Sequence, residues 1–219
     1  MSLLLSLEAS TPAIGVGLHD IKSGKSLGEI VRPGARGDVL PELIAQVLRD
    51  AGATPSDVTQ LACGVGPGSF TGIRAALASA QGFALRRGLP VLGISSLLAA
   101  LAHPDIEALA ARPRVALLDA YREEIFVHRL EIGASALPDR SPDLRLSRHD
   151  LSELTHDTVV LWHGRTREGI PEAALDLLEY LRPAGIARLA LSGNFTEAVP
   201  NYLREAAPVE ARMAARKSV

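Results

Sequence analysis

Short apolar runs separated by polar turns open the chain and predict strands. Residues 3–9 form a nearly continuous apolar run, which is typical of a strand buried on both faces. Residues 14–19 alternate apolar side chains with glycine, and residues 26–31 follow after a polar turn. Together the three runs predict an antiparallel meander that ends at Pro33 and Gly34.

Two helices and a buried strand are expected next. Over residues 39–50 apolar side chains recur at helical spacing, which predicts a helix with Asp38 as its cap. A strand beginning at residue 61 runs into a glycine-proline loop, and an alanine-rich helix is expected over residues 71–87. Small side chains lie on more than one face of this second helix. It is therefore either wedged between a sheet and a neighbouring helix, or it packs on the sheet and on a partner at once.

The pattern partly restarts in the second half of the chain. Residues 114–119 form an apolar strand that ends in Asp119, as the first strand ends in Glu8, and a paired strand is expected over residues 124–130. A loop over 134–148, a helical turn over 150–154, a strand over 158–162, a helix over 172–181 and a strand over 187–191 are then predicted. This order indicates two related α/β halves, of which the second is smaller.

Composition and charge exclude several classes of protein. Of the 219 residues 47% are hydrophobic and 22% are charged, and the net charge of −2 provides no overall attraction to nucleic acid or membranes. No apolar run is long enough to span a bilayer, and the start lacks the basic residues of a signal peptide before Glu8. Cys63 is the only cysteine, so no internal disulfide can form. We therefore expect a cytoplasmic protein.

The loop between the strand at residue 61 and the alanine-rich helix is a candidate binding element. Gly66, Gly68 and Gly72 allow backbone angles and close approaches that side chains forbid, and Ser69 or Thr71 can cap the helix. A strand-to-helix junction of this kind directs N–H groups toward one point, which suits a phosphate or a carboxylate. No Gly-Lys-Ser/Thr follows the glycines, so it is not a Walker A loop. A turn that simply needs small residues explains the same spacing.

Six segments of the chain carry a family resemblance. They are LSLEAST at residues 5–11, GVGPGSFTGIR at 64–74, QGFA at 81–84, GISS at 93–96, LDAYREEIF at 118–126 and PNYLR at 200–204. In this order, and above all through the second segment, they resemble the TsaB (YeaZ) family of bacterial tRNA threonylcarbamoyladenosine biosynthesis proteins.

The resemblance implies an α/β protein with the actin-like, Hsp70-like ATPase (ASKHA) fold, built from two ribonuclease-H-like subdomains. Residues 1–97 would form the first subdomain, completed by the C-terminal tail at 200–219, and residues 98–199 the smaller second one. The family's members are usually non-catalytic subunits that pair with the paralogue TsaD. In that complex, which TsaE also joins, TsaD transfers threonylcarbamoyl to adenosine 37 of tRNAs reading ANN codons. The resemblance thus implies contact with tRNA only through the complex, and a homodimer when TsaD is absent.

The residues also bear on whether this chain could catalyse the transfer itself. The catalytic paralogue carries a His-x-x-x-His pair, a spacing that places two metal ligands on one helix face. The resemblance aligns these positions with Ser96 and Ala100. No two histidines of the chain are four residues apart; they are His19, His103, His128, His149, His156 and His163. We therefore expect no catalytic residue, no metal site and no peptidase activity of the kind that an old glycoprotease label suggests.

A nucleotide site is the second implication of the fold. In the wider fold the loop after the first strand holds phosphate, and the acid at the strand end orients a magnesium-bound water. The residues at the matching positions, with the glycines of the later loop, are Glu8, Ser10, Thr11, Gly66, Gly68 and Asp119. Glu8 is longer by one C–C bond, roughly 1.5 Å, than the Asp that relatives often carry, which weakens a magnesium role. No cofactor is expected to be required, although ATP or ADP could be held at the interface with the partner.

Partner binding is the role that remains. The family pairs through the two helices that resemble residues 39–50 and 71–87, which form a four-helix bundle with the partner. The residues expected at this interface are Leu40, Leu43, Val47, Ser69, Phe70, Thr71, Arg74, Ala75, Ala76, Ser79 and Gly82.

Two rival functions stay open. The chain could be an actin-like ATPase or kinase that uses Glu8, Thr11 and Asp119. It could also be a tRNA-binding module that uses the basic residues of its tail, Arg212, Arg216 and Lys217. Turnover of ATP would favour the first rival, and salt-sensitive binding of tRNA to the isolated chain would favour the second.

Overall fold

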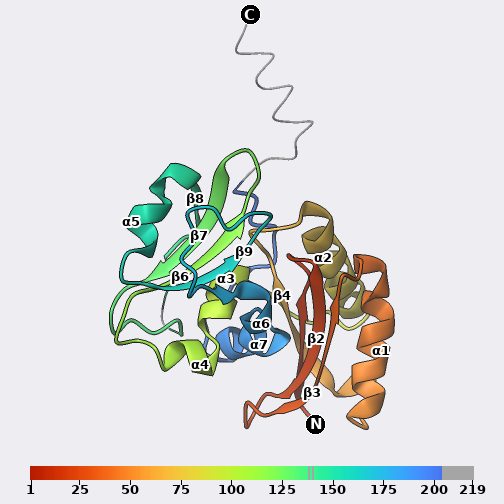
Figure 1. Ribbon diagram of the computed structural model, residues 1–219. Helices are drawn as coiled ribbons and strands as arrows, with labels where there is room; N and C mark the ends of the chain where they lie inside the picture. Colours follow the sequence, from red (N-terminus) through yellow and green to blue (C-terminus); the bar gives the residue numbers. More distant parts are fainter. Residues whose placement is uncertain (138, 140, 204–219) are drawn as a thin grey trace, which may run out of the picture.

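The protein consists of two β-sheets with helices around and between them (Figure 1). The computed structural model describes residues 1–137, 139 and 141–203. The first sheet has the strand order β11-β5-β4-β1-β2-β3, and the second has the order β10-β9-β6-β7-β8. The strands of the first sheet are β1 (Leu3–Glu8), β2 (Ala13–Asp20), β3 (Ser26–Pro33), β4 (Val58–Gly64), β5 (Val91–Ile94) and β11 (Thr196–Glu197). Those of the second are β6 (Arg114–Asp119), β7 (Glu124–Leu130), β8 (Leu144–Ser147), β9 (Val159–His163) and β10 (Leu175–Asp176).

The helices connect and cover these strands. They are α1 (Leu40–Asp50), α2 (Phe70–Leu85), α3 (Ser96–Leu101), α4 (Pro104–Glu107), α5 (Leu151–Thr155), α6 (Leu177–Tyr180) and α7 (Pro183–Leu191). Short 3-10 turns lie at η1 (Gly37–Val39), η2 (Pro55–Asp57) and η3 (Arg148–Asp150). A membrane-crossing helix would need a longer apolar stretch than any helix in the described ranges provides.

The two sheets repeat one topology. In the first, β1, β2 and β3 form an antiparallel meander, and β4 and β5 add parallel strands beside β1. In the second, β6, β7 and β8 form the meander, and β9 and β10 are the parallel strands. The predicted pair of related halves is therefore confirmed, and Glu8 and Asp119 do stand at equivalent strand ends.

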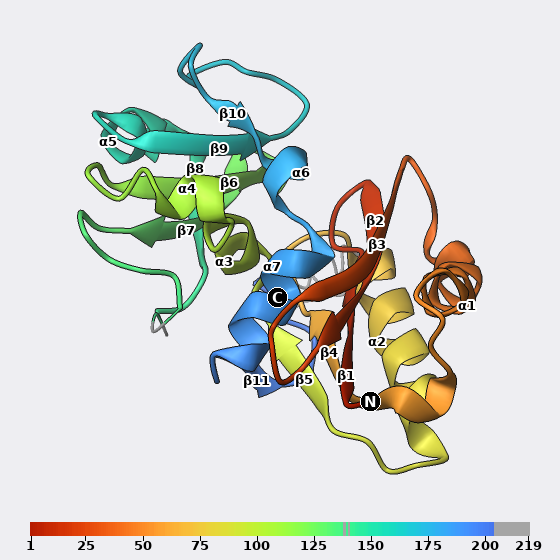
Figure 2. The ribbon, with the colours of Figure 1, turned by 90° about the horizontal axis from the view of Figure 1, so that it is seen from below.

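Helices cover both faces of the first sheet (Figure 2). Leu3, Leu5 and Leu7 of β1 belong to the core beneath α1 and α2, whereas Leu4 belongs to the core that α3 and α7 share. All six residues of β1 are buried, which explains its continuous apolar run. This central strand thus fixes where its carboxyl end, at Glu8, meets the rest of the molecule.

The glycines of β2 make room for α7. A Cβ atom added at Gly15 would lie 2.6 Å from Cγ of Pro183, and one added at Gly17 would lie 2.9 Å from Cβ of Pro183. Glu29 of β3 fixes the start of the same helix, because its carboxylate accepts hydrogen bonds from Arg182 Nε and from the N–H of Ala184, each at 2.9 Å. Glycine alternates with apolar residues in β2 because α7 packs directly on this strand and leaves no room for side chains at Gly15 and Gly17.

Four predicted elements need correction. The strand predicted over residues 187–191 is part of helix α7. The segment predicted as a helix over 172–181 begins with a loop and the short strand β10, and only the single turn α6 is helical. The loop predicted over 134–148 contains strand β8. Asp38 lies inside the turn η1, and the residue that precedes α1 is Val39, whose side chain makes no capping hydrogen bond.

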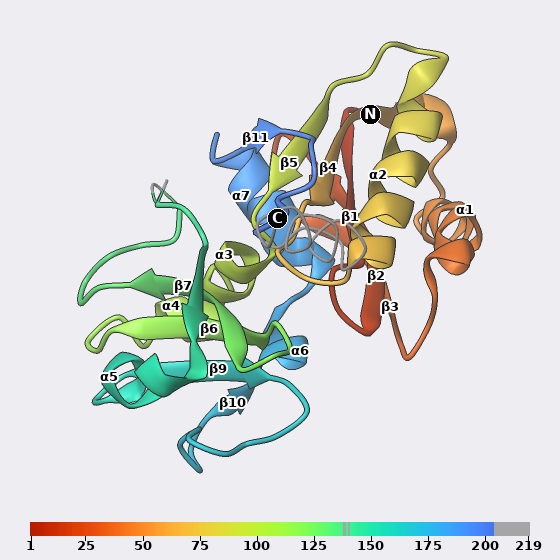
Figure 3. The ribbon, with the colours of Figure 1, turned by 90° about the horizontal axis from the view of Figure 1, so that it is seen from above.

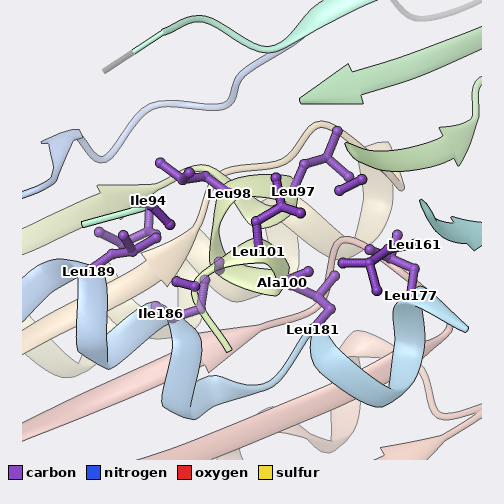
Figure 4. Close-up of a cluster of buried hydrophobic side chains, with 14 of the residues drawn as sticks. Ile94, Leu97, Leu98, Ala100, Leu101, Leu161, Leu177, Leu181, Ile186 and Leu189 are labelled. Atoms are coloured by element: carbon purple, nitrogen blue, oxygen red, sulfur yellow. The ribbon is translucent and has the colours of Figure 1, made fainter. Parts of the chain in front are cut away.

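A hydrophobic core lies between the two sheets. Helices α3, α6 and α7 meet there, with Leu97 and Leu101 of α3 near Ile186 of α7 and Leu181, which follows α6 (Figure 4). Gly185 allows a close crossing, because a Cβ atom at this position would collide with the carbonyl group of Ala99. The division into subdomains at residues 1–97 and 98–199 stays a prediction, but α7 packs on β1 and β11 pairs with β5 of the first sheet.

Candidate functional site

A cleft of about 870 Å³ lies where the loops at the carboxyl ends of β1 and β6 face each other. The loops after β1 and β4 and the start of α2 form one wall, and the turn after β6 with the residues after β9 forms the other. The segment after β11 closes one side through Asn201 and Tyr202. Seven of the residues predicted to bind a nucleotide or a partner line the cleft: Ser10, Thr11, Gly68, Ser69, Phe70, Thr71 and Asp119.

Glu8 is turned away from this cleft and is fully engaged by its own chain. Its Oε1 accepts a hydrogen bond from the N–H of Ser10 at 2.6 Å, and its Oε2 accepts one from Ser96 Oγ at 2.8 Å. The side chain is 1% exposed, and burial raises the pKa of Glu8, against the opposing effect of these hydrogen bonds. A carboxylate in this position cannot orient a magnesium-bound water in the cleft, so the residues present do not fit that role.

The glycine-rich loop is packed against the chain itself. The N–H of Gly66 donates to Ser96 Oγ at 3.3 Å, and the N–H of Ser69 donates to the carbonyl of Ser10 at 2.6 Å. Cβ atoms at Gly68 and Gly72 would collide with the carbonyls of Ser10 and Ala9. Gly66 does not line the cleft. The glycines therefore serve this close approach of two loops, as the plain-turn interpretation expected.

Ser69 is the cap of α2, one of the two residues predicted for this place. Its Oγ accepts a hydrogen bond from the N–H of Gly72 at 3.2 Å, and its own backbone is extended. Ser10, behind it, has a buried Oγ that finds no hydrogen-bond partner among the described residues.

The opposite wall of the cleft is built on Asp119. Its Oδ1 accepts a hydrogen bond from the N–H of Tyr121 at 2.9 Å, and its Oδ2 accepts one from Arg165 Nε at 3.0 Å. Partial burial would raise the pKa of Asp119, but the hydrogen bonds from Tyr121 and Arg165 and the charge of Arg165 outweigh it and lower the pKa. The carboxylate thus caps a turn and pairs with an arginine, which leaves it poorly suited to hold magnesium.

Three consecutive residues of this wall have left-handed backbone conformations. Tyr121, Arg122 and Glu123 have φ values of 61°, 52° and 58°, although none of them is glycine. The turn is fixed by hydrogen bonds at both ends, including one of 2.8 Å from the N–H of Arg148 to the carbonyl of Glu123. Arg165 covers one face of the Tyr121 ring, with its guanidinium carbon 4.3 Å from the ring centroid. Sequence reasoning missed this feature, because left-handed turns are usually signalled by glycine or asparagine.

The helix faces predicted to bind a partner are only partly available. Leu40, Leu43 and Val47 of α1 and Ala76 of α2 are at most 1% exposed and lie in this chain's own core. The prediction that these four side chains contact a partner is therefore wrong; they hold the two helices in place. The pattern located the helices but assigned some of their inward-facing residues to the outer face.

The outer face of α2 carries five of the seven remaining predicted residues and two that were missed, whereas Ser69 and Phe70 lie at the cleft. Thr71, Arg74 and Gly82 are exposed, and Ala75 and Ser79 are half-buried. Ala78 and Leu85 lie on the same face, and Leu85 is 83% exposed. Figure 3 shows α1 and α2 side by side on the side of the first sheet that faces away from the second sheet. Helical spacing over residues 71–85 could have identified the stripe, because its members recur every three or four positions.

An aromatic pair anchors the start of this face. The rings of Phe70 and Tyr202 stack with their centroids 4.8 Å apart, and Arg74 lies over Phe70 with its guanidinium carbon 4.2 Å from the centroid. Arg74 Nε also donates a hydrogen bond to the Tyr202 hydroxyl at 3.2 Å. The segment after β11 therefore covers the beginning of α2, a contact over 128 positions of sequence that no local pattern predicts.

The histidines lie apart from this site, except His163, which lines the cleft. Ser96 and Ala100, which stand where the catalytic paralogue has its histidines, are buried in α3. Within the described residues, no three His, Cys, Asp or Glu side chains are arranged to hold a metal ion. Cys63 is buried, and burial followed by the negative charge of Glu8 raises the pKa of its thiol, as expected of a core residue. The basic tail residues Arg212, Arg216 and Lys217 lie outside the described residues.

Comparisons with known proteins show which proteins the chain is similar to. The family model described as TsaD, tRNA N6-adenosine threonylcarbamoyltransferase, matches residues 37–206. The tRNA threonylcarbamoyladenosine biosynthesis protein TsaB of Haemophilus influenzae is 37% identical over 123 residues, which cover 56% of this chain and 51% of that protein. The protein of the same name from Escherichia coli K12 is 26% identical over 180 residues, 81% of this chain and 67% of its own length. The chain thus spans about half the length of the Haemophilus relative that it matches.

Solved structures show the same likeness. YeaZ from Pseudomonas aeruginosa has a TM-score of 0.72 and 26% identity, and the match covers 93% of this chain and 100% of that one. The predicted actin-like fold of two α/β subdomains is therefore confirmed.

Proposed function

The chain belongs to the TsaB (YeaZ) family of tRNA threonylcarbamoyladenosine biosynthesis proteins, and on that premise we propose that it is a non-catalytic subunit that binds and activates a TsaD partner. TsaD would carry out the transfer of threonylcarbamoyl to adenosine 37 of tRNAs reading ANN codons, with TsaE in the same complex. In the absence of TsaD the same face would form a homodimer. The reaction would take place in the cytoplasm, with tRNA bound by the assembled complex.

The observation that carries this proposal is the outer face of α2. Ala78 and Gly82 are exposed small residues that leave the helix backbone accessible to a close neighbour. Apart from the adjacent residues and the backbone of α2 itself, no atom of the described residues lies within 4 Å of a Cβ added at Gly82. Leu85 exposes 83% of its surface at one end, and Arg74 is held in place at the other. A helix of the partner can approach this stripe closely, bury Leu85 and offer a carboxylate to Arg74.

The state of the two strand-end acids supports a role without catalysis. Glu8 is bonded to Ser10 and Ser96, and Asp119 is bonded to Tyr121 and Arg165. Neither carboxylate is left for magnesium or for a reacting water, which disfavours the rival ATPase or kinase. We infer that the chain needs no cofactor of its own, and that ATP or ADP in the complex would be shared with the partner.

Co-elution with TsaD in size-exclusion chromatography tests the interface. Ala78→Trp places a large ring on the exposed stripe, so it is expected to abolish the heterodimer while the monomer stays folded. Ser152→Trp, on the exposed side of α5 in the second sheet's layer, is the matched control and should co-elute like the parent chain. Unchanged co-elution of Ala78→Trp would refute the assignment of this face.

A further inference from the structure

Asp143 is a buried carboxylate at which three distant segments of the chain meet. It immediately precedes β8, and its side chain is 2% exposed. Its Oδ1 accepts a hydrogen bond of 2.8 Å from Ser95 Oγ and lies 2.8 Å from His128 Nδ1, and its Oδ2 accepts one of 2.8 Å from Asn201 Nδ2. These partners come from the start of α3, from β7 and from the segment after β11. A residue of the second sheet's meander therefore holds the segment that follows the last strand of the first sheet.

Asn201 is fixed through both its side chain and its backbone. Its side-chain amide donates to the buried carboxylate, and its backbone N–H donates to the carbonyl of Val65, just after β4, at 2.8 Å. The next residue, Tyr202, stacks on Phe70 and accepts a hydrogen bond of 3.2 Å from Arg74 Nε. Consecutive Cα atoms are only about 3.8 Å apart, so the position of Asn201 restricts where the ring of Tyr202 can lie.

The contacts of Tyr202 order the first cation on the outer face of α2. The guanidinium carbon of Arg74 lies 4.2 Å from the centroid of Phe70, and its Nε bonds to the Tyr202 hydroxyl. A long side chain that is already ordered loses less conformational entropy when a partner binds it. The contacts thus form a continuous path from the meander of the second sheet to the start of α2, although β8 and α2 lie on different sides of the molecule (Figure 1).

We propose that Asp143 is a positioning residue for the outer face of α2. Through Asn201 it holds Tyr202 over the start of the helix, and Tyr202 in turn orders Arg74 for a partner. The binding part of this inference rests on the proposed role of the face in binding TsaD, whereas the position of Tyr202 is a property of the chain alone. A purely structural role for the buried cluster predicts no change at Tyr202 and no change in partner affinity as long as the protein is folded.

Fluorine-19 NMR of the folded chain labelled with 3-fluorotyrosine measures where the Tyr202 ring lies. The chain has three tyrosines, and Tyr202→Phe identifies the resonance of interest. Asn201→Ala removes the donor to Asp143 but keeps the backbone hydrogen bond, so the Tyr202 resonance should move toward its position in Phe70→Leu, where the ring has lost its stacking partner. Asp143→Asn, which offers one amide oxygen in place of two carboxylate oxygens, should move the resonance in the same direction.

Asn194→Ala is the matched control, because Asn194 also ties a segment beside β11 to the second half of the chain. Its Nδ2 donates to the carbonyls of Ala136 and Leu137 at 3.2 Å and 3.1 Å. The substitution removes a tether of the same chemical kind that does not reach Asp143. The Tyr202 resonance should therefore stay where it is in the parent chain.

Calorimetric titration of TsaD into the same variants measures the consequence for the interface. Asn201→Ala should bind TsaD roughly 3- to 10-fold more weakly, the equilibrium shift that one hydrogen bond can impose. In the Arg74→Ala background the same substitution should have no further effect, because Asn201 acts through Arg74. Asn194→Ala should bind TsaD like the parent chain.

Four results would overturn the proposal. The first is an unmoved Tyr202 resonance in Asn201→Ala, and the second is unchanged affinity of this variant for TsaD. The third is an equal loss of affinity in Asn194→Ala, and the fourth is an undiminished effect of Asn201→Ala in the Arg74→Ala background. A parent chain that does not bind TsaD would refute the proposed function instead, and the NMR comparison alone would then decide whether Asp143 positions Tyr202.

Discussion

Replacing His128 with glutamine should strongly destabilise the protein, because this buried side chain lies between two carboxylates. His128 of β7 is 1% exposed, and its Nδ1 lies 2.8 Å from Asp143 while its Nε2 lies 2.9 Å from Asp139. Asp143 also accepts hydrogen bonds of 2.8 Å from Ser95 Oγ and from Asn201 Nδ2. The cluster thus ties the second sheet to the start of α3 and to the segment after β11.

The magnitude follows from the burial of the partners. Burial alone would lower the pKa of His128, but the hydrogen bonds and charges of Asp143 and Asp139 outweigh it and raise the pKa above the ordinary 6.5. The protonated imidazolium form of His128 is therefore the form that the two carboxylates stabilise. Asp143 has a side chain only 2% exposed, so removal of the cation leaves a buried carboxylate without its counter-charge. Loss of one partner from a buried pair costs about 3–5 kcal/mol.

Urea unfolding followed by tryptophan fluorescence measures this cost directly. Trp162 is the only tryptophan and is buried in β9, so its emission reports on the same sheet. We expect His128→Gln to lower the free energy of unfolding by about 3–5 kcal/mol at pH 6. Because the folded pKa is raised, the stabilisation is fully present below pH 6.5 and is lost as the pH rises through the folded pKa. His149→Gln, at an exposed histidine of η3, is the control. A difference below 1 kcal/mol, or one that does not change with pH, would refute the reasoning.

Three further predictions concern the first sheet. Burial lowers the pKa of His19 from 6.5 to about 4, so stability should fall by roughly 3 kcal/mol as the pH drops from 6.5 to 4, and urea titrations of His19→Gln should show a smaller fall. Gly17→Ala should cost about 1–3 kcal/mol in thermal unfolding, because its Cβ would lie 2.9 Å from Cβ of Pro183 and 2.7 Å from His19 Nε2. Glu8→Ala should cost about 1–3 kcal/mol by leaving the Ser96 hydroxyl without its acceptor, while Glu8→Gln should keep both stability and activity in the complex. Loss of activity in Glu8→Gln without loss of stability would favour the ATPase rival.

Sequence reasoning predicted those elements in which apolar side chains recur at regular spacing. The meander of β1, β2 and β3, the helices α1 and α2, and the restart at β6 all follow from apolar spacing. Helix α7 was missed because its Pro183 and Gly185 look like helix breakers. In the structure Pro183 occupies the first turn, where its missing N–H costs nothing, and Gly185 allows the close crossing at Ala99.

The candidate site was only partly predictable, because its key contacts join distant segments. Tyr202 meets Arg74 across 128 positions, and Arg165 meets Asp119 across 46. Alanine occurs on both the inward and the outward face of α2, so the presence of small side chains does not by itself distinguish the two faces. Ala76 was therefore placed at the interface, although a tryptophan there would disrupt the core, and Ala78 is the position at which the interface can be tested.

Formation of threonylcarbamoyladenosine at position 37 of an unmodified tRNA transcript tests the central claim most directly. The reaction would contain the threonylcarbamoyl adenylate and either this chain, TsaD or both. The proposal predicts product with both proteins, little with TsaD alone, none with this chain alone, and loss of the stimulation with Ala78→Trp. Product formed by this chain alone, or equal product from TsaD with and without it, would contradict the role of a non-catalytic activator.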